Sequence, residues 1–260
     1  MSPPVIEARD VRVWYPVRRG VLAHTVGFVK AVDGVSFALG EGEVLGIVGE
    51  SGSGKTTLSR AILGLEPLHS GEILLFGGNR AQFNAAQRRE ATLKLQVVFQ
   101  DPFASLNPRH TVLDLVTEAM VAHGLADKRS RIAEAKRLLA EVGLPGDILD
   151  RYPHAFSGGQ RQRIAIARAL SLSPKVVICD EAVSALDLSV RAQILNLLLD
   201  LRDRRGLSYV FITHDIGVVS HVADGIAVMH GGRFVETGAA EDVLAHPCDA
   251  YTKSLLANAL

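Results

Sequence analysis

The sequence has only two cysteines, Cys179 and Cys248, and they lie far apart without a repeated pattern. This excludes a disulfide framework and favours a reducing compartment. No apolar run approaches the roughly 20 residues needed to cross a bilayer, and residues 1–4 do not resemble the start of a signal peptide. The 28 basic residues balance the 28 acidic residues, which argues against a general electrostatic grip on nucleic acid. We therefore expect a soluble, cytoplasmic chain.

Of the 260 residues, 48% are apolar and 22% are charged. A chain of this length and composition can bury a substantial core. Strands are predicted at residues 5–15, 32–39, 43–49, 72–76, 95–99, 176–180, 209–213, 225–229 and 233–237. The runs at 95–99, 176–180 and 209–213 are nearly all apolar, which is typical of parallel strands covered on both faces. The first two runs alternate and predict an antiparallel edge layer.

Helical spacing replaces the strand signal between residues 102 and 160, which predicts a helical subdomain inserted into an α/β core. We predict a single domain over residues 1–260. Its α/β core comprises residues 1–100 and 165–237, the helical subdomain residues 101–164, and a helical C-terminal tail residues 238–260.

A glycine-rich motif, Gly-x-x-x-x-Gly-Lys-Thr, occupies residues 49–56 between a predicted strand and a predicted helix at 57–64. Its glycines let successive backbone N–H groups turn toward one anion at the positive end of that helix. A flexible turn is the plain alternative, but the flanking strand and helix favour a phosphate loop, with Lys55 on the phosphates and Thr56 on Mg²⁺. The residues expected to contact a nucleotide are Gly49, Glu50, Ser51, Gly52, Ser53, Gly54, Lys55, Thr56 and Thr57.

Two acids, Asp180 and Glu181, end the apolar run at 176–180, where open α/β sheets place their ligands. Neighbouring residues of a strand point to opposite sides, so we expect the two carboxylates to have different roles. Asp180 would hold the shell of Mg²⁺. Glu181 would accept a proton from an attacking water. An isolated pair of this kind could equally be a helix cap, but behind a phosphate loop the catalytic interpretation is favoured.

Two other polar side chains follow predicted core strands directly. Gln100 follows the run at 95–99, and its neutral amide can contact Mg²⁺ or the attacking water. His214 follows the run at 209–213 in the same way. Either alone is an ordinary strand end, whereas both beside a phosphate loop predict a catalytic site.

The segment Ser157-Gly158-Gly159-Gln160 lies between the phosphate loop and the acidic pair and opens a predicted helix at 160–169. In this order the motifs resemble those of the ABC-type ATPases over essentially the whole chain. The matching segments are the phosphate loop at 49–56, the Q-loop at Gln100, the signature at 157–160, Walker B at 176–181, the D-loop at 184–187 and the switch histidine at His214.

This resemblance implies a P-loop NTPase fold that uses ATP and Mg²⁺. It implies catalytic roles for Glu181, His214, Gln100 and Lys55, and magnesium ligation by Thr56, Gln100 and Asp180. Two such domains would face head to tail, so that Ser157, Gly158, Gly159 and Gln160 of one close on the γ-phosphate held by Lys55 of the other. Tyr15 matches the adenine-stacking aromatic of the family, with Trp14 as second choice and an ordinary edge-strand aromatic as the alternative.

Finer features resemble the ATPase subunits of dipeptide, oligopeptide and nickel importers. They lie at residues 15–20, 29–37, 99–109 and 246–256, the last with Asp249-Ala250 where His-Pro is common. The resemblance implies two transmembrane permease subunits, a second ATPase subunit, an indirect solute-binding protein and no nucleic acid. For the second ATPase subunit a paralogue is favoured over a copy of this chain, and the sequence leaves both open. The chain would lie at the cytoplasmic face of the inner membrane. With two cysteines it lacks the four thiolate ligands of the iron–sulfur tail that many relatives carry.

Two rival functions stay open at this point. An ABC ATPase of translation, DNA repair or chromosome organisation would carry a second cassette, a zinc module or a long coiled coil, and no such feature is apparent. An accessory ATPase of a soluble enzyme complex such as the carbon–phosphorus lyase has a similar ending, but would give no reason for the insertion at residues 18–30. The transported solute cannot be named from this chain.

Overall fold

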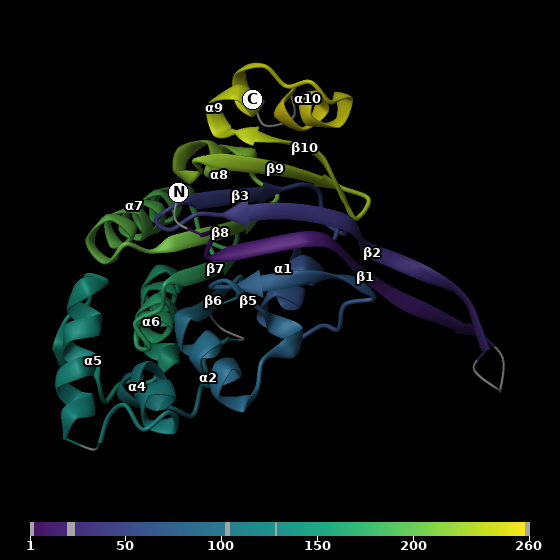
Figure 1. The fold of residues 1–260 in the computed structure, drawn as a ribbon. Helices are drawn as coiled ribbons and strands as arrows, with labels where there is room; N and C mark the ends of the chain where they lie inside the picture. Colours follow the sequence, from purple (N-terminus) through teal and green to yellow (C-terminus); the bar gives the residue numbers. More distant parts are fainter. Residues whose placement is uncertain (1–2, 20–23, 102–104, 128, 258–260) are drawn as a thin grey trace. The chain divides into compact units, whose positions relative to one another are not determined.

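The computed structural model describes residues 3–19, 24–101, 105–127 and 129–257. The chain divides into two compact units, one from Met1–Ala91 with Ser208–Leu260 and the other from Thr92–Leu207. Residues 20 and 102–104, which belong to two of the segments that resemble peptide importers, lie outside the described residues. Figure 1 shows the strands and helices of both units.

The first unit contains an antiparallel sheet with the strand order β2-β1-β4-β5. Its strands are β1 (Ile6–Arg19), β2 (His24–Leu39), β4 (Ser70–Leu75) and β5 (Gly78–Asn79). Alternate residues of β1, such as Ile6 and Ala8, are buried, which confirms the predicted antiparallel layer. Both strands of the β1–β2 pair are longer than predicted, and their distal halves extend as a two-stranded ribbon (Figure 1). That extension is exposed, so its pattern carries no burial signal.

The same unit has a second set of strands, in the order β10-β9-β3-β8. They are β3 (Val44–Val48), β8 (Ser208–Thr213), β9 (Gly225–His230) and β10 (Arg233–Ala239). Strand β3 runs parallel to both β8 and β9, and β3 and β8 are buried along their whole length, as predicted for the core. The helices of this unit are α1 (Lys55–Leu63), η1 (Arg80–Gln82), α8 (Ile216–Val222), α9 (Ala240–Ala245) and α10 (Ala250–Ala257), while α2 (Ala85–Lys94) crosses into the second unit.

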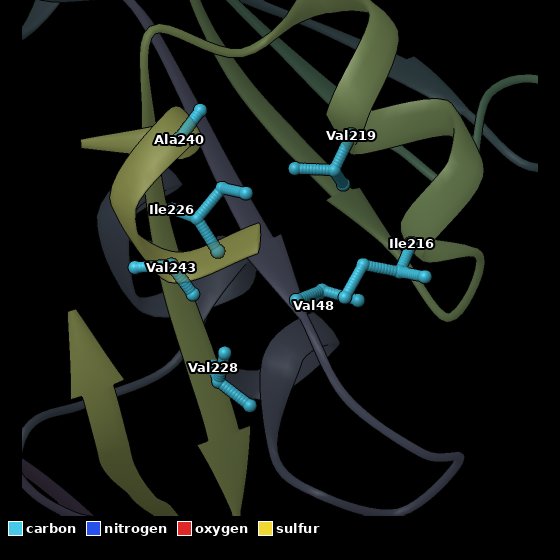
Figure 2. Close-up of a cluster of buried hydrophobic side chains, with 7 residues drawn as sticks. All are labelled: Val48, Ile216, Val219, Ile226, Val228, Ala240 and Val243. Carbon is cyan, nitrogen blue, oxygen red and sulfur yellow. The ribbon is translucent and has the colours of Figure 1, made fainter. Parts of the chain in front are cut away.

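A cluster of buried aliphatic side chains joins β3, α8, β9 and α9 (Figure 2). We call it the Val48 cluster; its members are Val48, Ile216, Val219, Ile226, Val228, Ala240 and Val243. Val48 and Val228 are fully buried, and each such side chain contributes roughly 1.5–3 kcal/mol of transfer free energy. Because Val48 is the last residue before the glycine-rich segment, the cluster fixes the base of that segment.

The second unit contains a parallel strand pair, β6 (Leu95–Phe99) and β7 (Val176–Asp180), at the predicted bounds. Strand β7 is fully buried, whereas β6 buries only Leu95 and Val98 because it lies at the end of the strand order. The expectation that the strand at 95–99 is covered on both faces is therefore wrong. The unit's helices are α4 (Val112–Ala122), α5 (Ser130–Glu141), η2 (Gly146–Ile148), η3 (Pro153–Ala155), α6 (Gly158–Leu170) and α7 (Leu188–Arg205).

Helices α4, α5 and α6 pack against one another and confirm the predicted helical region. The ends of α5 and α7 are joined by Arg205, whose guanidinium donates to the Glu141 carboxylate at 2.7 and 2.8 Å. No helix among the described residues is long and apolar enough to cross a membrane. The predicted domain boundaries at residues 100 and 165 stay a prediction.

Candidate functional site

The glycine-rich segment connects buried strand β3 to helix α1. Gly54 occupies the N-cap of α1 with φ 109°, and a Cβ added there would lie 2.1 Å from the backbone oxygen of Ala31. Only glycine meets both conditions. No side chain caps this helix, so its first N–H groups lack the acceptor that Ser, Thr or Asp usually supplies. An uncapped helix start with a left-handed glycine is suited to an anion.

Lys55 is the first residue of α1 and is buried at 4% exposure. Its ammonium donates to the carbonyl oxygens of Gly49 and Glu50, both at 2.7 Å, and to Ser53 Oγ at 3.3 Å. The charge therefore lies inside the curve of the segment instead of extending into solvent. Thr56, the next residue, is exposed. The loop thus presents a positive charge, helix N–H groups and a hydroxyl together, which is the chemistry predicted for phosphate binding.

His214 is placed beside this loop by sheet register. Strands β3 and β8 are parallel with Val48 opposite Thr213, so His214 leaves β8 where Gly49 leaves β3. The next residue, Asp215, caps α8 by accepting the N–H of Gly217 at 2.9 Å. His214 is therefore held between a buried strand and a capped helix, with its side chain exposed.

Tyr15, from β1, lies in the same unit, and its hydroxyl makes side-chain hydrogen bonds with Glu66 and Thr57, the last loop residue predicted to contact nucleotide. Burial, followed by the interaction with Glu66, raises the pKa of Tyr15. Trp14 is engaged elsewhere, because His69 stacks on its ring at 4.2 Å and the Lys30 ammonium lies 4.5 Å from the ring centroid. Of the two candidate aromatics, Tyr15 is the one beside the loop.

The acidic pair lies at the end of β7 in the second unit. Asp180 is buried at 6% exposure and lies opposite Phe99 of β6, so Gln100 and Glu181 leave adjacent strand ends together. The strand stops at Asp180, and Glu181 has a left-handed backbone with φ 52°. Strand alternation, the reason expected for different directions of the two side chains, is thus wrong, because Glu181 lies past the end of the strand and has a left-handed backbone. A non-glycine residue with this φ is uncommon and is found at functional sites.

The Ser157–Gln160 segment begins helix α6 with a capping box. Ser157 Oγ accepts the N–H of Gln160 at 3.4 Å, and Gln160 Oε1 accepts the N–H of Ser157 at 3.1 Å. A Cβ added at Gly159 would lie 2.4 Å from Cγ1 of Val190 in α7, so glycine is required for this close approach. Asp187 caps α7 by accepting the N–H of Val190 at 2.9 Å, and this bond lowers the pKa of Asp187.

Oxygen donors suited to Mg²⁺ occur in both units. The first unit supplies the Thr56 hydroxyl; the second supplies the Asp180 carboxylate and the Gln100 amide at adjacent strand ends. The hydroxyl, the carboxylate and the amide are each oxygen donors of the kind that Mg²⁺ prefers, and this ion usually keeps waters and phosphate oxygens among its ligands. Among the described residues no group of three His, Cys, Asp or Glu side chains could hold a metal ion by itself.

The two cysteines differ in environment. Cys179 is fully buried within β7, where burial, and to a lesser degree the charge of Asp180, raises the pKa of its thiol. Cys248 is exposed in the segment before α10. A buried thiol of raised pKa is a poor metal ligand. The absence of an iron–sulfur cluster stays a prediction.

One contact on the loop comes from a residue without a predicted role. The N–H of Glu50 donates to the hydroxyl of Tyr251, in helix α10, at 3.0 Å. The sequence contained a partial signal, since Tyr251 lies in the segment 246–256 that resembles the importer ATPases. Nothing in that pattern indicated a contact with the loop.

Residues 32–184 match the family model described as ABC transporter. The chain belongs to this family. The match covers more than half of the sequence and includes the phosphate loop, Gln100, the signature and the acidic pair. The ABC ATPase has the fold class predicted from the sequence, a P-loop core with an antiparallel layer and a helical region.

Curated relatives cover nearly the whole chain. The oligopeptide transport ATP-binding protein AppF of Bacillus subtilis is 46% identical over 98% of this chain and 78% of its own length. The dipeptide transport ATP-binding protein DppF of Escherichia coli is 47% identical over 98% of this chain and 76% of its own length.

Solved structures support the same fold. The protein cbiO1 of Clostridium perfringens, part of the ABC transporter complex cbiONQ, matches with a TM-score of 0.79 and 26% identity over 94% of this chain and 92% of that chain. A dimeric ATP-binding cassette bound to ADP and Pi in a post-hydrolysis state matches with a TM-score of 0.78 and 27% identity over 90% and 98% of the two chains.

Proposed function

We propose that this ABC ATPase is the ATP-binding and ATP-hydrolysing subunit that energises an importer for peptides or a related small solute. The observation that carries the proposal is the uncapped start of α1, with Lys55 buried inside the loop that precedes it. Family membership supports ATP hydrolysis. The peptide class rests on identities of 46–47% to oligopeptide and dipeptide transport ATP-binding proteins.

Nucleotide binding is assigned to the loop and to Tyr15. The N–H groups of the loop and α1 bind phosphate oxygens, and Lys55 moves from the loop carbonyls to the β- and γ-phosphates. Tyr15 stacks on the adenine; its place beside Thr57 and the engagement of Trp14 by His69 support this choice. Stacking of this kind contributes roughly 1–3 kcal/mol per base.

Thr56, Asp180 and Gln100 would hold Mg²⁺, since each offers an oxygen that this ion prefers. When bound, the ion neutralises charge on the phosphates. Gln100 has a second role in orienting the attacking water, and its place beside Glu181 at adjacent strand ends supports this assignment. His214 orients the γ-phosphate from the end of β8.

Glu181 is the general base that takes a proton from the attacking water. The left-handed backbone at Glu181, one residue past the end of β7, supports a role separate from that of Asp180. Glu181→Gln keeps the shape but removes the base. We expect ATP affinity within about twofold of wild type and turnover lower by about 10²–10⁴-fold.

The measurement is ATP hydrolysis by the assembled transporter, with affinity from titration calorimetry on the isolated chain. Glu241→Gln, a change at an exposed acid of α9 outside the proposed site, is the matched control and should leave turnover unchanged. Turnover of Glu181→Gln within a few-fold of wild type would remove Glu181 from the mechanism.

The signature segment acts on the ATP of a partner ATPase subunit, in a head-to-tail pair. The dimeric cassette among the structural relatives supports pairing. Two permease subunits, and through them a solute-binding protein, complete the complex at the cytoplasmic face of the membrane; contact with the permeases falls in the helical region after Gln100. A paralogous partner is favoured over a copy of this chain. Affinity purification of the native complex, followed by identification of its subunits, tests both assignments: a complex that lacks membrane subunits contradicts the importer role.

A further inference from the structure

The C-terminal tail is anchored to the first unit at both ends of helix α10. Before the helix, the Glu236 carboxylate of β10 accepts the N–H groups of Cys248 at 2.7 Å and Asp249 at 3.1 Å. Along the helix, Tyr251, Leu255 and Leu256 pack against the Val48 cluster of Figure 2. The tail is therefore a fixed part of this unit and can transmit a constraint to the loop that follows Val48.

Tyr251 makes that connection directly. Its ring lies 4.1 Å from the ring of His230, the last residue of β9, at an interplanar angle of 38°. Its hydroxyl accepts the N–H of Glu50 at 3.0 Å, a normal hydrogen-bond length. The ring contact with His230 orients the hydroxyl toward the loop.

The peptide group that donates this bond is the one that Lys55 also contacts. The carbonyl of Gly49 and the N–H of Glu50 belong to a single peptide plane, in which they point in opposite directions. Lys55 Nζ donates to the Gly49 carbonyl at 2.7 Å, and the Glu50 N–H donates to Tyr251. The plane is thus held on one edge by the phosphate-binding lysine and on the other by the tail.

Rotation of this plane would move the carbonyl that positions the Lys55 ammonium. Without Tyr251 the Glu50 N–H has no hydroxyl to hold it, and the plane is constrained from the lysine side alone. Preorganisation of a binding loop lowers the ordering cost that a ligand must meet. Since the Glu50 N–H donates to Tyr251, the N–H groups that remain for phosphate binding are those of the residues after Glu50.

We propose that Tyr251 is a positioning residue for the phosphate loop: its hydroxyl sets the Gly49–Glu50 peptide and thereby the resting position of Lys55. This inference rests on the proposed role of that loop in ATP binding. It assigns the tail segment at 246–256 a task within the ATPase site itself. Tyr251 does not touch the reacting atoms; it acts through Lys55.

Tyr251→Phe tests the inference because it removes only the hydroxyl and keeps the ring against His230. One neutral hydrogen bond corresponds to a loss of ATP affinity of about two- to tenfold. The loss is measured by titration calorimetry on the full chain, in a Glu181→Gln background that prevents hydrolysis. In the assembled transporter with an intact Glu181, KM for ATP rises by the same factor while kcat is retained, since ground state and transition state lose the contact equally.

Leu255→Ala is the matched control, because it loosens the packing of α10 on the Val48 cluster and leaves the hydroxyl in place. It should lower the melting temperature without changing ATP affinity. A second control is the double variant that combines Tyr251→Phe with Lys55→Ala. If Tyr251 acts through Lys55, the double variant binds ATP with the same affinity as Lys55→Ala alone. A purely structural role of Tyr251 would persist in that background.

Unchanged affinity and KM in Tyr251→Phe, alongside a loss in Lys55→Ala, overturn this inference alone. Equal loss of affinity in Leu255→Ala and Tyr251→Phe also overturns it, because packing of the tail would then explain the result. A Lys55→Ala variant that binds ATP as wild type does overturns both the inference and the role proposed for the loop.

Discussion

Two helices of this ABC ATPase begin at glycine-rich segments, and they begin differently. Helix α1 starts at Gly54 with no side-chain cap, whereas α6 starts at Ser157 with both hydrogen bonds of a capping box. In α1 no side chain caps the positive end of the helix. In α6 the Ser157 side chain already accepts the N–H of Gln160.

This difference separates two kinds of anion site. The start of α1, reinforced by the buried ammonium of Lys55, can hold a phosphate by itself. At the start of α6 the Ser157 side chain already occupies the N–H of Gln160, and no lysine lies within the segment 157–160. This agrees with the proposal that the signature segment acts on the ATP of a partner subunit and does not bind ATP by itself. Two glycine-rich helix starts can therefore differ in their capacity to hold an anion.

The largest effect is expected at α1. Lys55→Ala should lower ATP affinity of the isolated chain about ten- to a hundredfold, because a charge-assisted contact is lost. Ser157→Arg, the matched change at α6, should leave that affinity unchanged while abolishing hydrolysis in the assembled transporter. Titration calorimetry and ATPase assays give the two quantities. Equal loss of affinity in both variants would break the comparison, since the signature would then bind the ATP of its own chain.

The next effect concerns packing at α6. Gly159→Ala places a methyl group against Val190 and should destabilise the chain by about 1–3 kcal/mol, the usual cost of overpacking. At Gly158 an added Cβ lies 3.6 Å from Leu186, an ordinary contact, so Gly158→Ala should be tolerated. Urea denaturation of both variants measures the free energy of unfolding. If the two alanine variants have the same stability, the close approach of α6 and α7 does not constrain Gly159.

A smaller effect should come from the cap itself. Ser157→Ala removes the acceptor for the Gln160 N–H and should cost about 0.5–1 kcal/mol, the low end for caps because the 3.4 Å bond is long. Ser157→Asn supplies another side-chain oxygen and should recover most of the loss. Thermal unfolding of the two variants provides the check. An alanine variant as stable as wild type would show that α6, like α1, does not depend on its cap.

The smallest effect is a pH dependence in the unit that contains α6. Burial opposes ionisation of Glu141, but its hydrogen bonds with Arg205 together with the positive charges of Arg205, Arg137 and Arg204 outweigh this and lower its pKa. A carboxyl whose pKa is lowered by folding adds stability above its unfolded pKa, and this stability is lost as the pH falls through the folded value. Wild type should therefore exceed Glu141→Gln in unfolding free energy at pH 7, with a gap that narrows toward pH 3. A gap independent of pH would exclude the ion pair as its cause.

The sequence predicted the buried strands well, because a covered strand must be apolar throughout. The bounds of β6 and β7 agree with the predicted 95–99 and 176–180, and β3 and β8 differ by one or two residues. Helices α2, α7 and α8 were not predicted. In α7 the apolar residues of 194–198 follow one another too closely to show helical spacing, although five residues of the helix are buried.

The site was predicted as a set of motifs and not as a set of contacts. Motif spacing identified Lys55, Gln100, Asp180, Glu181 and His214, since each follows a strand or opens a helix. It could not show that Lys55 rests on the carbonyls of Gly49 and Glu50, nor that Glu181 has a left-handed backbone. The bond between Glu50 and Tyr251 joins residues 201 positions apart, and periodicity carries no information about such pairs.

The close approach of Gly159 to Val190 also has a genetic consequence. Because a methyl group added at 159 would lie too close to Val190, the two positions should not vary independently among relatives of this chain. A larger residue at 159 becomes acceptable when 190 is reduced to alanine, so Val190→Ala should act as a second-site suppressor of Gly159→Ala. Substitutions in the signature segment at position 159 and in α7 at position 190 should therefore occur together among relatives.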